Sequence, residues 1–339
     1  MTYLYDGSGR LATVTDKIGN ATGQDPTQHR WTYAYDGVTR HISTITDPDG
    51  RVRVTNTYDA QGRGYQQRDG LGALTQIAYG IGETTLTDPR GHAARYTFDG
   101  RMRVLSQSDT VGAATYTISY TYDAAGNRTA VTDRNGNRTD FAYDARGNVL
   151  TKTDPSPDGV APRPLTAFAY DLRNNLTQIT DARGFVTTLS YDPATNALLS
   201  VSRQIDGATS AVTKYEYADP ANAGLPTRVI APRGNSGPTP DTTYATLLTY
   251  ASRGHLETRI APDGAPTSSG YDLAGRLTSF IDPDGFAPGA VPAEHTWAIQ
   301  YDANDRETSR TDPLGNTLAY GYDGAGDRTA VTDRRGNVT

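Results

Sequence analysis

The stretch YDAAGNRTAVTDRNGN at residues 122–137 returns almost unchanged as YDGAGDRTAVTDRRGN at residues 322–337, with thirteen of sixteen positions identical. Self-similarity of this kind indicates an array of equivalent structural units. Each copy contains Tyr-Asp, a glycine three residues after the aspartate, and a second Asp-x-x-Gly about ten residues later. The pattern therefore predicts a unit with two turns that is repeated along the chain.

Tyr-Asp, or a close variant of it, recurs through the whole sequence, and its shortest regular spacing is 21 residues, as from Tyr122 to Tyr143. Longer spacings contain insertions rich in proline and glycine, at 155–164 and 231–241. Residues 1–339 are thus predicted to be a single array of about fourteen units, the last of them cut mid-unit. The repeated aromatic position is occupied by Tyr5, Tyr35, Tyr58, Tyr79, Phe98, Tyr122, Tyr143, Tyr170, Tyr191, Tyr217, Tyr250, Tyr271, Tyr301 and Tyr322.

Both Asp-x-x-Gly elements predict hairpin turns. Aspartate can accept hydrogen bonds from backbone N–H groups two residues on, and glycine takes a positive φ without steric cost. Together they describe a type I turn followed by a left-handed residue. Proline at the second position (Pro48, Pro89, Pro283, Pro313) fits the φ required there. The predicted second turns are Asp16–Gly19, Asp47–Gly50, Asp88–Gly91, Asp133–Gly136, Asp181–Gly184, Asp312–Gly315 and Asp333–Gly336.

Consecutive turns are separated by six or seven residues, the length of a strand. The residue two before each repeated aromatic, such as Tyr33, Phe141 or Tyr320, is large and apolar in twelve of fourteen units, and the intervening residue is mostly small or polar. This alternation predicts strands with one packed and one wet face. We therefore expect an all-β fold, a long antiparallel ribbon of stacked hairpins. Its tyrosines should form a column along one edge, where the ring packs and the hydroxyl reaches a polar partner.

The two copies above, with YDARGNVLTKTD (143–154) and YDLAGRLTSFIDPDG (271–285), resemble the YD repeats of Rhs proteins, of the B and C components of insecticidal toxin complexes, and of teneurins. The resemblance covers essentially the whole chain. It implies a ribbon that spirals into part of a hollow shell, a β-cage, which in bacterial members encloses a C-terminal toxic domain. The residues that carry the repeat signature are Tyr5, Asp6, Gly9, Tyr35, Asp36, Tyr58, Asp59, Gly62, Tyr122, Asp123, Gly126, Tyr143, Asp144, Gly147, Tyr170, Asp171, Tyr191, Asp192, Tyr271, Asp272, Gly275, Tyr301, Asp302, Tyr322, Asp323 and Gly326.

The sequence departs from the full family pattern at its C-terminal side. The array stops at Thr339, and neither the self-cleaving core segment of polymorphic toxins nor a divergent C-terminal domain is present. The expected partners are therefore the rest of the same polypeptide, with its capping and core segments and its enclosed toxin domain. A bare array also exposes sheet edges, which invite association.

Composition argues against several other classes of protein. The net charge is −6 and the arginines are scattered, whereas a nucleic-acid binder shows a basic stripe or patch. No apolar run approaches a membrane span, and the N-terminus lacks a signal peptide, so export would need another route or a signal outside this chain. The absence of cysteine excludes disulfides, thiolate metal sites and cysteine nucleophiles.

No catalytic, cofactor or metal site is predicted. The histidines are dispersed, and packing or surface roles are expected for His29 and His295 beside Trp31 and Trp297. Aspartate pairs recur in every unit, whereas catalysis needs one special environment. A calcium loop at 47–50 or 282–285 would need further acidic ligands that the sequence lacks. The Asn-x-Thr sequons at Asn127, Asn137 and Asn175 follow from the repeat itself.

Three functions remain, in decreasing order of support. The first is a wall segment of a shell that encloses a toxin or other passenger. The second is an extracellular adhesin whose exposed aromatic side chains hold carbohydrate or other cell-surface glycans; burial of Tyr33, Phe141 and Tyr320 would count against it. The third is an enzyme, although the sequence contains none of the catalytic motifs that would indicate one. The first two functions both imply a secreted or cell-surface protein.

Overall fold

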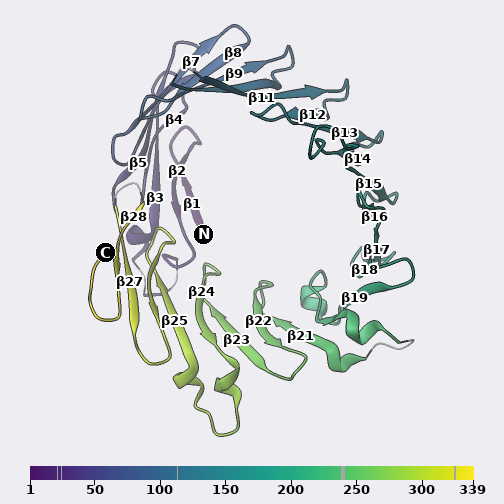
Figure 1. Ribbon diagram of the computed structural model, residues 1–339. Helices are drawn as coiled ribbons and strands as arrows, with labels where there is room; N and C mark the ends of the chain where they lie inside the picture. The colour runs from purple at the N-terminus through teal and green to yellow at the C-terminus, as the bar shows by residue number, and fades with distance from the viewer. Residues whose placement is uncertain (21, 24, 113, 238–240, 324–325) are drawn as a thin grey trace.

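The computed structural model describes residues 1–339 apart from 21, 24, 113, 238–240 and 324–325. It contains one sheet of 28 strands, in which each strand pairs antiparallel with the next in chain order. The sheet stays open, and its ribbon curves around a central opening (Figure 1). The expected all-β hairpin array is thereby confirmed.

The odd-numbered strands lead into the first turn of each unit, and the even-numbered strands lead back. The odd-numbered strands are β1 (Thr2–Tyr5), β3 (Arg30–Tyr35), β5 (Val52–Tyr58), β7 (Leu74–Gly80), β9 (Ala93–Phe98), β11 (Ala114–Tyr122), β13 (Arg138–Tyr143), β15 (Leu165–Tyr170), β17 (Val186–Tyr191), β19 (Ser210–Glu216), β21 (Ala245–Tyr250), β23 (Pro266–Tyr271), β25 (Thr296–Tyr301) and β27 (Thr317–Tyr322). The even-numbered strands are β2 (Leu11–Thr15), β4 (Ile42–Thr46), β6 (Gly64–Asp69), β8 (Glu83–Thr87), β10 (Val104–Val111), β12 (Arg128–Thr132), β14 (Val149–Thr153), β16 (Leu176–Thr180), β18 (Leu198–Gln204), β20 (Arg228–Ile230), β22 (Leu256–Ile260), β24 (Leu277–Ile281), β26 (Glu307–Thr311) and β28 (Arg328–Thr332). Six short 3₁₀ helices lie in the connections: η1 (Pro26–His29), η2 (Pro220–Asn222), η3 (Pro232–Asn235), η4 (Thr242–Tyr244), η5 (Pro283–Phe286) and η6 (Pro292–His295).

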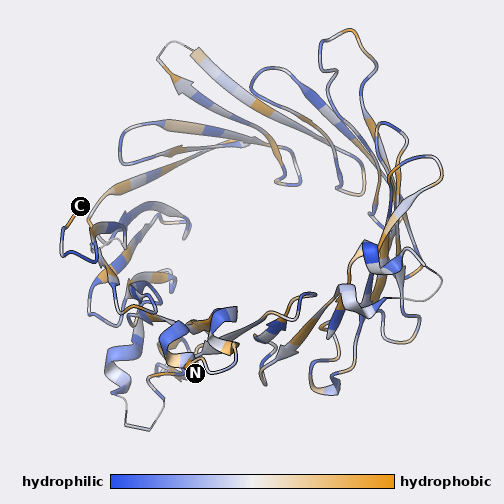
Figure 2. Ribbon diagram, turned by 60° about the horizontal axis from the view of Figure 1, so that its bottom comes forward, coloured by the Kyte–Doolittle hydropathy of each residue, from blue (hydrophilic) through white to orange (hydrophobic). Residues whose placement is uncertain are grey.

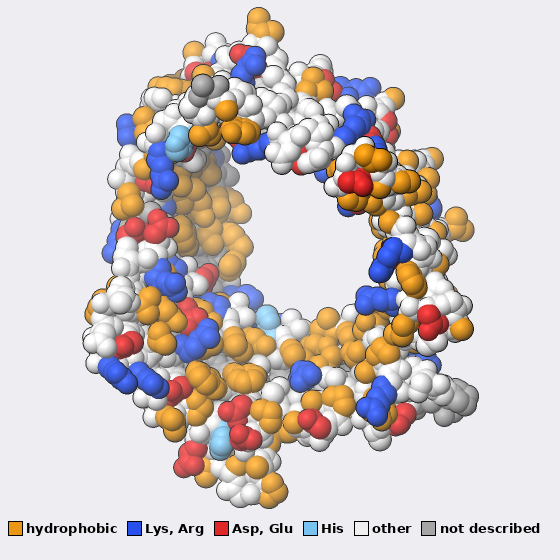
Figure 3. All heavy atoms as spheres, in the orientation of Figure 1, with side chains coloured by type: hydrophobic (Ala, Val, Ile, Leu, Met, Phe, Trp, Pro, Cys, Tyr) orange, Lys and Arg blue, Asp and Glu red, His pale blue; other side chains and the backbone are white. Residues whose placement is uncertain are grey.

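Hydrophobic and hydrophilic residues alternate along the strands (Figure 2), so the two faces of the ribbon differ in polarity. Cross-strand pairs such as Tyr33 with Ile45 and Tyr120 with Val131 join large side chains on one face. Small or polar residues such as Ala34 and Thr121 occupy the other face and are exposed. The wall around the opening is largely hydrophobic (Figure 3), so the apolar face lines the opening. Because few side chains on that face are fully buried, the described residues leave it open to further contact.

Two connections depart from the predicted short turns, and a third, predicted as an insertion, has the same form. The segments 16–29, 231–244 and 282–295, here called the lobes, have equal length and are closed at their base by one backbone hydrogen bond, for example Asp16 N–H to His29 O at 3.2 Å and Asp282 N–H to His295 O at 3.4 Å. The prediction of a tight second turn at Asp16–Gly19 is therefore wrong, and the Pro283 turn is instead helix η5.

Each lobe packs a glycine where the predicted turn would have a left-handed one. Gly19 and Gly285 do not take a positive φ. A Cβ on Gly19 would lie 2.5 Å from His29 Cβ, and one on Gly285 would lie 2.8 Å from His295 Cβ. These two glycines are therefore required for close packing and not for a turn. The predicted insertion 231–241 lies wholly within the second lobe, and its residues 238–240 lie outside the described residues.

The C-terminal hairpins of the ribbon come back to the β4–β5 hairpin (Figure 1). Asn304 Nδ2 donates to Asp49 Oδ2 at 3.0 Å, and Arg306 Nη2 lies 3.7 Å from the same oxygen. The guanidinium of Arg53 lies against Gly326, where a Cβ would approach Nη2 to 2.5 Å. We call this contact, between the β4–β5 hairpin and the turns after β25 and β27, the spiral seam. It closes one turn of the spiral through side chains, without strand pairing.

Candidate functional site

The first turn of each unit is held by its aspartate. Asp6 N–H donates to Arg10 O at 2.7 Å, and Gly9 N–H donates to Asp6 O at 2.9 Å. The Asp6 carboxylate accepts the N–H groups of Ser8 and Arg10 at 2.8 and 2.9 Å. Gly9 has φ +76°, and the strand register shifts between Leu4 and Tyr5. This is the geometry of a type I turn with a left-handed residue and an adjacent bulge.

Some turns keep the left-handed residue without glycine. Met102, Asn174 and Asp305 have positive φ three residues after the turn aspartate, and Arg40 and Asn196 have it four residues after, in turns that are one residue longer. The Asp-x-x-Gly pattern cannot find these turns, although the preceding Tyr-Asp or Phe-Asp marks all five. A left-handed non-glycine residue costs about 1 kcal/mol, so the surrounding ladder must impose the turn there.

In many turns the residue after the left-handed position binds the outer oxygen of the turn aspartate. In the turns that carry arginine the contact is an ion pair, as between Arg103 and Asp99 at 2.6 Å. In others it is an amide hydrogen bond, as from Asn148 Nδ2 to Asp144 Oδ2 at 2.9 Å. The hydrogen bond from Asn148 is the largest of the causes that lower the pKa of Asp144 to about 2.

This lowered pKa predicts acid sensitivity with a defined sign. Because the folded-state pKa of Asp144 lies below the ordinary value of about 4, its stabilisation is present above pH ~4 and is lost as the pH falls through about 2. The variant Asn148→Ala removes the main cause of the lowered pKa. The urea midpoint of this variant, measured from pH 7 down to pH 2, should begin its acid decline at higher pH than that of the wild type. Identical profiles would contradict this role for Asn148.

The tyrosine column joins each unit to the one before it. The hydroxyl of the repeated tyrosine donates to a carbonyl at, or just before, the start of the preceding even-numbered strand, as from Tyr191 to Leu176 O at 3.0 Å. The ring therefore bridges two hairpins and satisfies a backbone acceptor, which phenylalanine cannot do. The tyrosines that make this bond are Tyr35, Tyr58, Tyr79, Tyr122, Tyr143, Tyr191, Tyr217, Tyr250, Tyr271, Tyr301 and Tyr322.

Removal of one hydroxyl from the column should therefore be measurable. Tyr191→Phe is expected to lower the free energy of unfolding by about 1 kcal/mol, because it leaves Leu176 O without its donor. Tyr65→Phe is the control, since Tyr65 is exposed and its hydroxyl makes no hydrogen bond with the described residues. Equal urea midpoints for the two variants would show that the column acts through its rings alone.

The arginines that pair with the turn aspartates also lie against the rings of the tyrosine column. Arg10 lies 4.5 Å from the ring centre of Tyr35, and Arg103 lies 4.6 Å from that of Tyr122. Each guanidinium is thus shared between its own turn aspartate and the tyrosine of the next unit. Arg103 also donates to Asp123 O of the next turn at 3.1 Å. Through these contacts the signature residues link each first turn to the next along one edge of the ribbon.

The structure places the predicted signature residues at these turns. Every signature tyrosine is the last residue of an odd-numbered strand, followed by its turn aspartate. His29 lies 3.3 Å from Asp16, and His295 lies 3.4 Å from Asp282, each closing a lobe. The residues that the structure describes contain no cluster of three metal-ligating side chains. None of their helices is long or apolar enough to span a bilayer.

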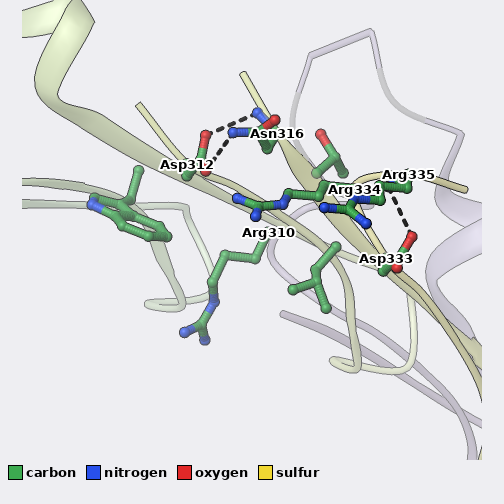
Figure 4. A pocket seen from close by; sticks show the side chains of 9 residues that line it. Arg310, Asp312, Asn316, Asp333, Arg334 and Arg335 are labelled. Carbon is green, nitrogen blue, oxygen red and sulfur yellow. Dashed lines mark hydrogen bonds between the residues drawn. The ribbon is translucent and has the colours of Figure 1, made fainter. Parts of the chain in front are cut away.

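One hollow stands out on the apolar face. Two adjoining cavities, each of about 420 Å³, share Trp297 and Arg310, and we call them together the Trp297 groove. Trp297 is 36% exposed and Leu318 is 40% exposed. The side chain of Arg334 reaches across one end of the groove toward Asp312 (Figure 4). Sequence patterns did not indicate this groove, because it depends on the neighbouring second turns 312–315 and 333–336.

The family model described as RHS Repeat matches residues 103–138, 122–160, 170–203 and 301–338. These segments of the chain carry RHS repeats. Among curated proteins, none matches the sequence significantly. The family match covers both copies of the duplicated stretch, so the repeat that predicted the ribbon is the repeat that defines the family.

Two solved structures share the fold of this RHS-repeat chain. The crystal structure of TcdB2-TccC3 has a TM-score of 0.58 and 16% identity, over 97% of this chain and 18% of that chain. The Photorhabdus luminescens Tc holotoxin pore has a TM-score of 0.61 and 16% identity, over 99% of this chain and 21% of that one. The RHS-repeat chain therefore spans about a fifth of the length of these chains. At such identity the likeness shows the fold alone.

Proposed function

We propose that residues 1–339 are one continuous wall segment of a shell that encloses a passenger, such as a toxin domain on the same polypeptide. The observation that carries this proposal is a curved hairpin ribbon whose apolar face lines an opening (Figure 3). A ribbon of this kind can enclose volume because each strand is held by its two neighbours and needs no central core. The partners are accordingly the remaining segments of the shell and its passenger, in a secreted or cell-surface RHS protein of the toxin-delivery type.

The wall is proposed to be structural and not enzymatic. The turn aspartates, such as Asp6, Asp144 and Asp333, bind backbone N–H groups in equivalent turns, whereas catalysis needs one special environment. A panel of hydrolase assays on the purified chain should give no activity above background. Activity that tracks one aspartate would contradict a purely structural role.

Small-angle scattering tests the shape on which the proposal depends. A solid globule of 339 residues would have a radius of gyration of about 20 Å. The open ribbon is expected to exceed this value, with a distance distribution weighted toward long distances. A compact solid particle would overturn the proposal. Enclosure is tested separately in the natural polypeptide, by comparing how fast proteases digest the passenger with and without the shell. Equal rates would contradict enclosure but would not contradict the ribbon shape.

Glycan binding remains the alternative. The aromatic side chains of Tyr33, Phe141 and Tyr320 are half-buried on the face that lines the opening, a poor position for meeting a cell surface. A glycan array that gave specific hits, abolished by substitution of these aromatics, would favour the adhesin instead.

A further inference from the structure

The Trp297 groove differs from the rest of the wall in the polar groups that it leaves available. Three guanidinium groups and two carboxylates line its polar end: Arg310, Arg334, Arg335, Asp312 and Asp333. Whether a ligand can bind there depends on which of these groups are already engaged within the protein.

Both carboxylates are used by their own turns. Asp312 accepts the N–H groups of Leu314 and Asn316 at 2.9 and 2.8 Å, and the amide of Asn316 at 2.9 Å. Asp333 is bound in the same way, with the amide of Asn337 at 2.9 Å from its second oxygen. Arg310 makes two hydrogen bonds of 3.0 Å to Glu307. These three side chains are therefore poor candidates for new contacts.

Arg334 and Arg335 remain, and the guanidinium of Arg335 likewise makes no hydrogen bond or ion pair with the residues that the structure describes; Arg334 is distinguished by its place between the two turn carboxylates. It lies close enough to Asp312 and Asp333 to help lower the pKa of both carboxyls, yet its guanidinium makes no hydrogen bond or ion pair with the residues that the structure describes. Beside it lie the exposed faces of Trp297 and Leu318. The groove thus offers a free cationic donor next to an apolar surface.

The other copy of the duplicated stretch shows what kind of group can pair with an arginine at this turn position. Arg134 occupies in the first copy the turn position that Arg334 occupies in the second. There the guanidinium is paired with a carboxylate from another strand, Asp109 of β10. The arginine of this turn therefore pairs with a carboxylate in the first copy, and in the second copy it has no ion pair with the residues that the structure describes.

We propose that the Trp297 groove binds an extended polypeptide segment in which an aspartate or glutamate lies next to a large apolar side chain. The carboxylate would pair with Arg334, as Asp109 pairs with Arg134, and the apolar side chain would lie on Trp297 and Leu318. A neutral sugar fits less well, because its hydroxyls need acceptors as well as donors and both carboxylates are occupied. Because the groove is on the face that lines the opening, the source of this segment is the enclosed passenger, and in that point the inference rests on the proposed function.

The chain carries its own reporter for the test. It has only two tryptophans, so Trp31→Phe leaves Trp297 as the sole tryptophan emission. The probes are the peptide acetyl-Gly-Phe-Asp-Leu-Gly-amide and its analogue with asparagine in place of aspartate. The acidic peptide should change the emission of Trp297 saturably and bind about two- to five-fold more tightly than the analogue, with the difference falling as salt rises.

Matched variants assign the effect to one guanidinium. Arg334→Gln should abolish the preference for the acidic peptide, Arg334→Lys should keep part of it, and Arg134→Gln, at the same turn position in the other copy, should leave it unchanged. Equal binding of the two peptides, no response to either, or a preference that survives Arg334→Gln would overturn the inference. So would a response to cellobiose that is independent of Arg334. A chain that scatters as an open ribbon but fails this titration would lose the inference and keep the proposed function.

Discussion

Gly234→Ala is expected to lower the free energy of unfolding by about 1–3 kcal/mol, although alanine usually stabilises a chain where it replaces glycine without strain. Gly234 is buried at the base of the second lobe. A Cβ there would lie 2.5 Å from Asp241 O, 2.9 Å from Ile230 Cγ2 and 3.0 Å from Tyr244 Cβ. The first of these atoms belongs to the backbone, so relief requires the lobe itself to move. The urea midpoint and the Tm both report the loss.

Gly224→Ala is the matched control for this prediction. Gly224 also lies in a connection, has no positive φ, and has no atom within 4 Å of the position of a Cβ. This variant should be neutral or slightly stabilising, because it reduces the freedom of the unfolded chain. Gly19→Ala and Gly285→Ala should also destabilise, since a Cβ would meet His29 or His295. If Gly234→Ala and Gly224→Ala have the same midpoint, the lobes are not closely packed as described.

The sequence was sufficient for the ribbon because the repeat encodes it locally. Asp6 and Gly9 fix a turn through contacts within five residues, and alternation fixes which face packs. The role of the tyrosine hydroxyl was also predictable in kind: a half-buried phenol needs an acceptor. Its particular partner was not, because the bond from Tyr191 to Leu176 O depends on the register between two hairpins.

The lobes show where the same reasoning fails. Asp16 and Gly19 match the turn pattern letter for letter, yet the chain continues to His29 before the next strand begins. The signal that separates the two cases lies further along the chain. A histidine follows ten residues after the glycine and a tryptophan follows two residues later, at His29 and Trp31 and again at His295 and Trp297.

The seam and the Trp297 groove could not be predicted from sequence for a different reason. Asp49 and Asn304 are separated by 255 positions, and only the accumulated curvature of the ribbon brings them together. The availability of Arg334 likewise depends on which acids its neighbours engage, a property of three adjacent strands and not of one motif.

Asp49→Lys is expected to open the spiral seam. The wild-type carboxylate accepts from Asn304 and faces Arg306, whose side chain is only 16% exposed. Lysine would remove the acceptor and place a second positive charge beside that guanidinium. Loss of a hydrogen bond to a charged group costs about 1.5–3 kcal/mol, which is a factor of ten or more in the balance between closed and open ribbon. The hairpins themselves do not depend on this contact, so their unfolding midpoint should change little.

Asp263→Lys is the matched control, because Asp263 occupies the same position in the turn Ala261–Gly264 as Asp49 does in Asp47–Gly50 and accepts only a local backbone N–H. Small-angle scattering should give a larger radius of gyration for Asp49→Lys than for Asp263→Lys. High salt should move the wild type part of the way in the same direction, because it screens the pair between Asp49 and Arg306. Identical scattering from the two lysine variants would mean that the curvature of the sheet alone holds the ring, and that the seam contributes no closure.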